Sequence, residues 1–255
     1  MNQFFDFNRF ALLVAKHWTE NKKRYLLSLL AFTGLLTGCF VISLVLRDDN
    51  MMEQEFQQTV YFFFLFTVGT FYASQYFRDL GSKTRGSNFL MTPASSFEKF
   101  LCGLLFVIIL FFVVFTSVFY LVDTLMVNLA NSLYNEANHR EVEVVNIFHV
   151  ALIEITESSE INLLLFYFAV QSAFLLGSAA FRKYSFIKTI IGLFLTWMFF
   201  ALLTYFIYRQ NAPDMDAPDL PGSYTQMLKV LTMYVIAPVL WLLTYSRLKN
   251  KQVAL

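Results

Sequence analysis

The chain has 255 residues, of which 57% are hydrophobic and 15% charged, and its formal net charge is +1. Because charged residues make up about a quarter of a soluble domain, this composition excludes an ordinary soluble protein. We expect the surroundings to be a lipid bilayer, and we expect no nucleic-acid partner.

The first predicted element is an amphipathic helix over residues 6–21. Its apolar face consists of Phe7, Phe10, Ala11, Val14 and Trp18. These positions follow a helical spacing, while Arg9, Lys16 and Glu20 lie on the opposite face. Asp6 is the expected N-cap. Aromatic residues opposed to Lys and Arg are typical of a helix lying in the plane of the cytoplasmic interface. A basic anchor next to the first span is the simpler alternative.

Six uncharged segments follow this helix along the chain. They cover residues 25–46, 56–77, 100–122, 161–181, 189–208 and 230–246. Each has close to the ~20 residues that a helix needs to cross a ~30 Å hydrocarbon layer. Inside lipid a helix satisfies its own backbone, and none of the segments alternates as a barrel strand would. The sequence therefore predicts an all-α polytopic protein with six transmembrane helices, in one membrane domain over residues 1–255.

Lysine and arginine are distributed unequally between the connecting segments. With the N-terminus inside, fifteen of the nineteen lie on the inner side. Only Arg47, Arg140, Arg209 and Lys229 lie outside. Because inner loops are enriched in Lys and Arg, we expect both termini to be cytoplasmic and the protein to lie in the inner membrane. The long external segment over residues 123–160 has no role that the sequence indicates.

The junction "LMTPASSFEKFL", residues 90–101, lies on the inner side between the second and third spans. Ser95 and Glu98 form the S-x-x-E pattern of a capping box, in which each side chain binds the other residue's backbone N–H. Pro93 disfavours helix immediately before it. The pattern predicts a defined turn that starts the third helix, and a helix start at the membrane surface explains these residues without any partner.

The longer stretch "FRDLGSKTRGSNFLMTPASSFEKFLCG" resembles the corresponding loop of the ABC-type-2 transporter permeases. The resemblance lies in the six-helix layout, the N-terminal in-plane helix and a few residues of this loop. Those residues are Pro93, Ala94, Ser95, Glu98 and Lys99. The chain departs from the family pattern at Thr92, where a second apolar residue is usual.

The resemblance implies that this loop carries a short coupling helix seated in a groove of a separate cytoplasmic ABC ATPase. The residues it assigns to that contact are Asp79, Lys83, Arg85, Phe89, Leu90, Met91 and Pro93. The charged ones would form the rim and the apolar ones the anchors of a small interface. It further implies a homodimer or a sister permease, and the Gly34–Gly38 pair allows close helix approach either between subunits or within one.

Intrinsic catalysis has little support in the sequence. In "GSKTRGSN", residues 81–88, Ser87 and Asn88 stand where a phosphate-binding loop requires Lys and Ser or Thr. We therefore expect no cofactor in this chain, with ATP and Mg²⁺ held by the partner ATPase. The spans contain no Asp, Glu, Lys, Arg or His, which argues against an intramembrane enzyme. The spacing of His139, Glu141, Glu143 and His149 fits no standard metal site, so no metal is expected.

Three polar residues within the spans are candidates for lining a pathway. They are Gln58, Gln75 and Gln171, for which hydrogen bonding between helices is an equally good explanation. The many phenylalanines are compatible with an amphipathic or lipidic cargo, and lipid-facing packing explains most of them without one. The function expected from the sequence is export by an ATP-powered permease. The alternative is a membrane sensor or scaffold that transports nothing.

Overall fold

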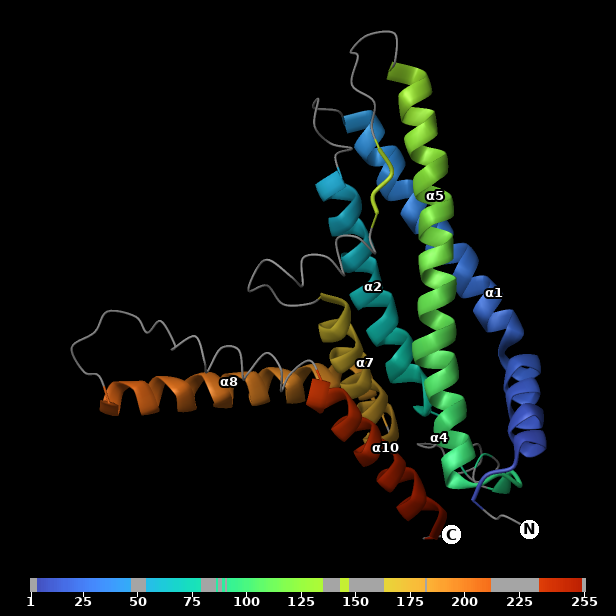
Figure 1. Ribbon diagram of the computed structural model, residues 1–255, viewed down its shortest axis with the longest axis vertical. Helices are drawn as coiled ribbons and strands as arrows, with labels where there is room; N and C mark the ends of the chain where they lie inside the picture. Colours follow the sequence, from blue (N-terminus) through green and yellow to red (C-terminus); the bar gives the residue numbers. More distant parts are fainter. Residues whose placement is uncertain are drawn as a thin grey trace. The chain divides into compact units, whose positions relative to one another are not determined.

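The computed structural model describes residues 4–46, 54–78, 91–134, 143–146, 163–181, 183–211 and 234–253, together with Gly86 and Phe89. Every regular element in these residues is a helix (Figure 1). The helices are α1 (Phe7–Leu46), α2 (Gln54–Tyr76), α4 (Ser96–Leu104), the π-helix η2 (Leu105–Leu110), α5 (Phe111–Tyr134), α7 (Leu163–Ala180), α8 (Ser185–Asn211) and α10 (Ile236–Val253). The predicted all-α class is confirmed.

Four helical stretches in the described residues are long and apolar enough to cross a membrane. They are Phe7–Val45, Ser96–Leu133, Leu163–Ala180 and Ser185–Phe206. The two other expected spans also fall on helices. However, α2 mixes Gln, Thr and Tyr with its apolar residues, and α10 contains Arg247, Lys249 and Lys251. That these two helices also cross the membrane stays a prediction.

The chain forms two compact units. The first combines Met1–Gly69 with Pro93–Leu163, and the second combines Thr70–Thr92 with Leu164–Leu255. The division falls within α2 and again at the end of the loop that the sequence predicts to be the coupling element. The sequence predicted one membrane domain over residues 1–255, and the two units are described separately below.

In the first unit, α1 and α5 run in the same direction and α2 runs against them (Figure 1). Near the start of α1, the His17 ring lies 4.4 Å from the Phe106 ring. Further along, Phe32 stacks on Phe115 at 4.8 Å. Later residues of α1 therefore meet later residues of the third helix, as parallel helices require. The ring of Tyr61 in α2 is fully buried against this pair of helices, and its hydroxyl lies 3.0 Å from the Thr116 hydroxyl.

The predicted N-terminal helix and the predicted first span form one continuous helix, α1. Residues 22–24, which separate the two predictions, are Lys, Lys and Arg, all good helix formers. The predicted apolar face divides between two environments. Phe10 and Val14 are half-buried beside the buried Leu13, whereas Phe7 and Trp18 remain 72% and 44% exposed. Whether this part lies in the membrane plane stays a prediction.

The third helix is longer than the predicted span 100–122. α4, η2 and α5 follow one another without a break over residues 96–134, with one π-helical stretch between them. The first residues of the segment expected outside, from residue 123 onward, therefore continue α5, and where this helix leaves the membrane stays a prediction. The reason is that a single carboxyl does not end a helix when the neighbouring residues remain apolar and helix-forming. Asp123 is fully buried inside this helix.

The second unit is held by close packing between α7 and α8. A Cβ atom added at Gly177 would overlap the Thr189 hydroxyl, so only glycine allows this approach. The Ser185 hydroxyl donates to the carbonyl oxygen of Ser74 at 2.8 Å, which fixes the start of α8 to the end of α2. Beyond its first turns α8 is exposed, since only 6% of its apolar window is buried.

Candidate functional site

The capping box predicted at Ser95 and Glu98 is present. The Ser95 hydroxyl accepts from the backbone N–H of Glu98 at 3.1 Å, and the Glu98 carboxylate accepts from the backbone N–H of Ser95 at 2.8 Å. Ser95 has an extended backbone, with φ −67° and ψ 158°, as an N-cap requires. The short sequence pattern therefore identified the first residue of α4.

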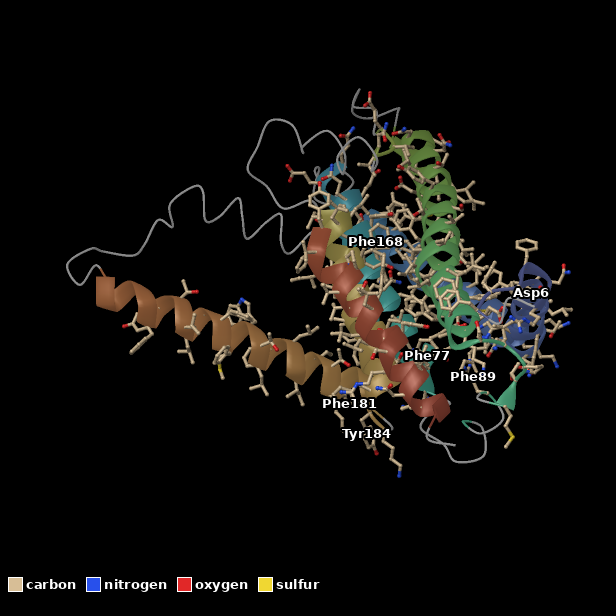
Figure 2. The ribbon with its side chains drawn as sticks, turned by 60° about the horizontal axis from the view of Figure 1, so that its bottom comes forward. Asp6, Phe77, Phe89, Phe168, Phe181 and Tyr184 are labelled. Carbon is tan, nitrogen blue, oxygen red and sulfur yellow. The ribbon has the colours of Figure 1, made fainter. Side chains whose placement is uncertain are left out.

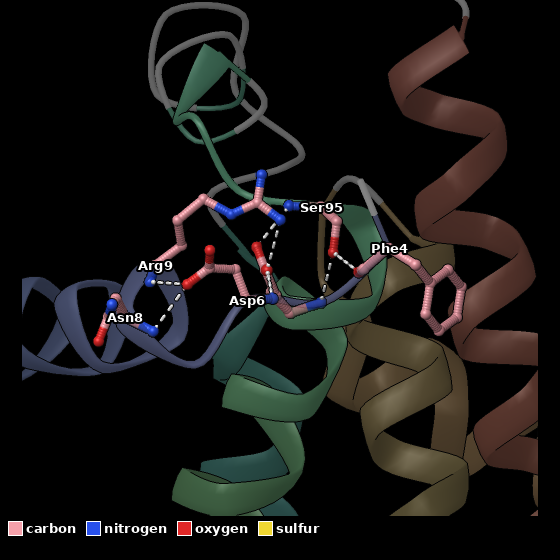
Figure 3. A network of polar contacts seen from close by, with 6 residues as sticks. Phe4, Asp6, Asn8, Arg9 and Ser95 are labelled. Carbon is pink, nitrogen blue, oxygen red and sulfur yellow. Dashed lines mark hydrogen bonds and ion pairs between the residues drawn. The ribbon is translucent and has the colours of Figure 1, made fainter. Parts of the chain in front are cut away.

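The second oxygen of the same carboxylate binds the start of α1. Glu98 Oε1 accepts from the backbone N–H of Asp6 at 2.8 Å and from Arg9 Nη2 at 3.0 Å (Figure 3). The Glu98 side chain has no exposed surface, while that of Arg9 is 39% exposed. One buried carboxylate therefore caps one helix and holds the first residues of another. The sequence reasoning treated Glu98 as a cap only and missed this contact.

Asp6 is the N-cap of α1, as predicted. Its side chain accepts from the backbone N–H of Asn8 at 2.8 Å and of Arg9 at 3.2 Å (Figure 3). The carbonyl oxygen of Asp6 accepts from the N–H of Phe10 at 3.0 Å, which is the first bond of the helix. These N-cap bonds fix the conformation of Asp6. Its backbone N–H is therefore already in place to donate to Glu98.

Apolar contacts cover the same place. The Ser95 hydroxyl donates to the carbonyl oxygen of Phe4 at 2.7 Å, and the Phe4 ring stacks on Phe97 at 4.8 Å. The Phe5 ring meets Phe97 edge-on at 6.2 Å. We call residues 4–9 together with residues 95–98 the N-terminal junction. It joins α1 to the third helix by hydrogen bonds, one ion pair and stacked rings.

Lys99 follows the N-terminal junction and is 2% exposed. It interacts electrostatically with Glu98, which is favourable, and with Lys16 of α1, which is unfavourable. The Lys16 ammonium also lies 4.0 Å from Glu20, and both of these side chains are mostly exposed. Both helices therefore contribute charged side chains to the contact between α1 and α4, and Glu98 lies buried at its centre.

The predicted ATPase-coupling residues lie in different settings. Asp79, Lys83, Arg85 and Leu90 fall outside the described residues. Among the others, Met91 is helical and 74% exposed, and Pro93 is also exposed. Phe89 is half-buried, and its ring lies 6.3 Å from Phe77 in an edge-on arrangement (Figure 2). Of the apolar anchors that the structure describes, Met91 is more exposed than Phe89.

A second tight connection occurs in the second unit, at the turn between α7 and α8. Tyr184 precedes α8 with a positive φ of 54°, which is unusual for a residue with a side chain. Phe181 lies on the other side of this turn (Figure 2), and Lys188 Nζ lies 5.7 Å from the centre of its ring. Lys251 of α10 donates to the carbonyl oxygen of Ala179 at 2.7 Å and so caps the end of α7. The sequence reasoning did not identify this cap.

The candidate pathway glutamines do not form one described site. Gln58 is half-buried in the first unit. Gln75 and Gln171 belong to the second unit, where Gln75 accepts from Arg78 Nη1 at 3.0 Å and Gln171 is fully buried. The buried glutamine of the first unit is instead Gln57, one residue before the predicted one. The burial of Gln57 could have been predicted only by knowing which side of α2 faces the other helices.

Within the described residues, no three side chains of His, Cys, Asp or Glu are grouped in a way that could hold a metal ion. His139, Glu141 and His149 lie outside these residues, and Glu143 is exposed. Comparisons of the chain with protein-family models, with curated proteins and with solved structures find no match. The function is therefore argued from the geometry of the chain itself.

Proposed function

We propose that this chain is the membrane-spanning permease subunit of an ATP-powered ABC exporter in the inner membrane. In this proposal all six predicted spans cross the membrane, both termini are cytoplasmic, and a separate cytoplasmic ABC ATPase binds ATP and Mg²⁺. The observation that carries the proposal is the N-terminal junction, in which Glu98 joins the end of the loop 78–99 to two long helices.

The mechanical reason is that a coupling loop must be stiff where it meets the membrane helices. A loop attached by a single flexible connection would absorb a partner's movement, whereas a rigid element transmits it. The third helix extends on the order of 60 Å at 1.5 Å per residue. Because α1 and α4 begin at the same buried carboxylate, a displacement of the loop acts on both helices together.

Met91 supports the position of the partner contact. It is a large apolar side chain, 74% exposed, and it stands four residues before the cap of α4. A small interface draws most of its affinity from a few such apolar anchors surrounded by polar residues. We propose that Met91 and Leu90 contact the ATPase, with Asp79, Lys83 and Arg85 at the rim.

A paired arrangement of two permease subunits is part of the proposal. The Gly34–Gly38 pair lies in α1, and a Cβ atom at either glycine would meet nothing within 4 Å. Among the described residues the chain therefore leaves this small-residue surface without a neighbour, which favours packing between subunits over packing within one. The cargo proposed from the apolar spans is amphipathic or lipidic.

The test compares Met91→Asp with Tyr184→Asp, which changes an equally exposed large side chain in another inner turn. Met91→Asp should abolish co-purification of the ATPase and its cargo-stimulated hydrolysis, because charging an apolar anchor typically costs about 2 kcal/mol or more of binding. Tyr184→Asp and Ser95→Ala should keep both. If Met91→Asp and Leu90→Asp each fold, retain the ATPase and keep normal hydrolysis, the loop is only a connector. If no ATPase binds the unmodified chain, the sensor or scaffold alternative is preferred.

A further inference from the structure

Asp123 is a carboxylic acid enclosed in the first unit. It lies in α5, has no exposed surface, and neither of its carboxyl oxygens has a hydrogen-bond partner among the described residues. Glu98, the other fully buried acid among the described residues of this unit, has three donors. Asp123 is thus an unpartnered acid inside a helix that is apolar enough to cross a membrane.

Helix register locates the surroundings of Asp123. The Tyr61 ring lies 5.0 Å from the Phe119 ring, and α2 and α5 are antiparallel. One helical turn beyond this contact leads to Gln57 on α2 and to Asp123 on α5. Gln57 is also fully buried.

α1 contributes to the same layer. Phe40 lies 6.2 Å from Phe119, and because α1 runs parallel to α5, the next turn carries Ser43. Ser43 is 5% exposed. The three helices therefore bring buried polar residues to one level, and we call Ser43, Gln57 and Asp123 the polar layer.

A non-helical segment over residues 143–146 lies against α2 in this unit. Gln57 Nε2 donates to the carbonyl oxygen of Glu143 at 3.0 Å, and Gln57 Oε1 accepts from the N–H of Val145 at 2.8 Å. Val145 is 1% exposed. The side-chain amide of Gln57 thus makes the pair of hydrogen bonds that a neighbouring strand would make, and it attaches the segment to α2 at the level to which helix register also brings Asp123.

An isolated ionised carboxylate in such a place is strongly unfavourable unless a positive charge accompanies it. No Lys, Arg or His among the described residues pairs with Asp123. A hard metal cation takes about six oxygen ligands, while the side-chain oxygens of the polar layer are few and one of them already accepts from Val145. A proton is the cation that needs no further ligands and no space.

We propose that Asp123 is a proton-binding site, which holds its proton while segment 143–146 covers the polar layer and releases it when that segment lifts. In the release step the O–H bond of the acid breaks and the proton passes to a water molecule, with no change of oxidation state. Lifting of the segment is then coupled to proton release. The inference does not depend on whether the chain transports a cargo.

Within two helical turns of the polar layer, and in segment 143–146, the other titratable groups among the described residues are few. They are Cys39 of α1, Glu55 and Tyr61 of α2, Tyr120 of α5, and Glu143 of that segment. Glu55 and Glu143 are exposed, and the Tyr61 hydroxyl is bonded to Thr116. Glu55 therefore provides a matched control, because it is an acid on the same unit that water already reaches.

The first measurement is thermal stability of the purified chain in lipid nanodiscs between pH about 5 and about 9. Wherever the native acid keeps a proton that the hydrated acid of the unfolded chain has lost, the melting temperature should fall as pH rises, and the fall should stop once the native acid also ionises. Asp123→Asn imitates the neutral acid and should abolish that part of the fall. Glu55→Gln should keep it.

The second measurement is infrared difference spectroscopy, which detects the carbonyl of a protonated carboxylic acid directly. The unmodified chain should show this band at neutral pH, and Asp123→Asn should lack it. Gln57→Leu, which releases segment 143–146, should weaken the band at the same pH. The proposal is overturned if the unmodified chain has no such band at neutral pH. It is also overturned if Asp123→Asn keeps the full pH dependence, or if Na⁺ at constant pH stabilises the unmodified chain but not Asp123→Asn.

Discussion

Replacing Glu98 by alanine should release the start of α1, which is far away in sequence but bound to the same carboxylate. The change removes the acceptor for the backbone N–H groups of Ser95 and Asp6 and the ion-pair partner of Arg9. The stacked rings of Phe4 and Phe97 remain. The expected result is a loosened N-terminal junction in a membrane domain that still folds.

The size of the effect follows from the number and kind of the lost contacts. A hydrogen bond to a charged acceptor contributes about 1.5–3 kcal/mol, but the donors here are part-buried, so water partly replaces the carboxylate. The ion pair adds at most about 1 kcal/mol because Arg9 is 39% exposed. We expect Glu98→Ala to cost about 3 kcal/mol, and Ser95→Ala, which removes one cap, to cost about 1 kcal/mol.

Hydrogen exchange measured by mass spectrometry provides the assay. A local loss of about 3 kcal/mol corresponds to roughly 100-fold faster exchange, and this should occur in two separate peptides, one containing Asp6 and one containing Ser95. Glu20→Ala is the matched control, since Glu20 is an exposed acid whose nearest ammonium lies 4.0 Å away. Faster exchange at Ser95 without any change at Asp6 would refute the argument that one carboxylate holds both helices.

Three further changes test other contacts of the two units. Gln57→Leu should expose the N–H of Val145 to exchange and leave α2 intact, because it removes the two bonds that the Gln57 amide makes to segment 143–146. Gly177→Ala should lower stability by about 1–3 kcal/mol through overlap with Thr189, and Thr189→Ala in the same chain should recover part of the loss in a thermal melt. Lys251→Met should cost about 0.5–1 kcal/mol by removing the cation at the end of α7, and an unchanged melting temperature would contradict this assignment.

Local signals in the sequence predicted those features that depend on a few neighbouring residues. The uncharged segments fall on helices because length and apolar character alone determine what lipid or a helical core accepts. Asp6 and the Ser95–Glu98 pair were identified as caps because a cap is completed within three residues. The break that the sequence predicted near residue 22 is absent from α1, because Lys and Arg are good helix formers and continue a helix without difficulty.

Features that depend on contacts between residues far apart in the sequence could not be predicted from local patterns. Arg9 and Glu98 are 89 positions apart, and nothing in either local pattern specifies the other as its partner. Asp123 was assigned to an external segment because hydropathy segments end at the first charged residue, although α5 continues through it. Gln57 and Gln58 are neighbours with the same side chain, and only the packing of α2 distinguishes the buried one from the half-buried one.

The two buried acids of the first unit lie on one continuous helical stretch, and their separation bears on how a movement would be transmitted. Glu98 and Asp123 are 25 positions apart, roughly 37 Å along a helix at 1.5 Å per residue. The π-helix η2 lies between them and carries Phe106, which packs on His17 of α1. A π-helical stretch holds an extra residue in its turn, and such turns frequently occur at functional sites. If the N-terminal junction is displaced, η2 is the place where the stretch can absorb or pass on the rotation. If η2 keeps its register, a rotation that starts at Glu98 reaches Asp123 and alters proton binding there. If η2 changes its register, the rotation ends at η2 and Asp123 stays enclosed.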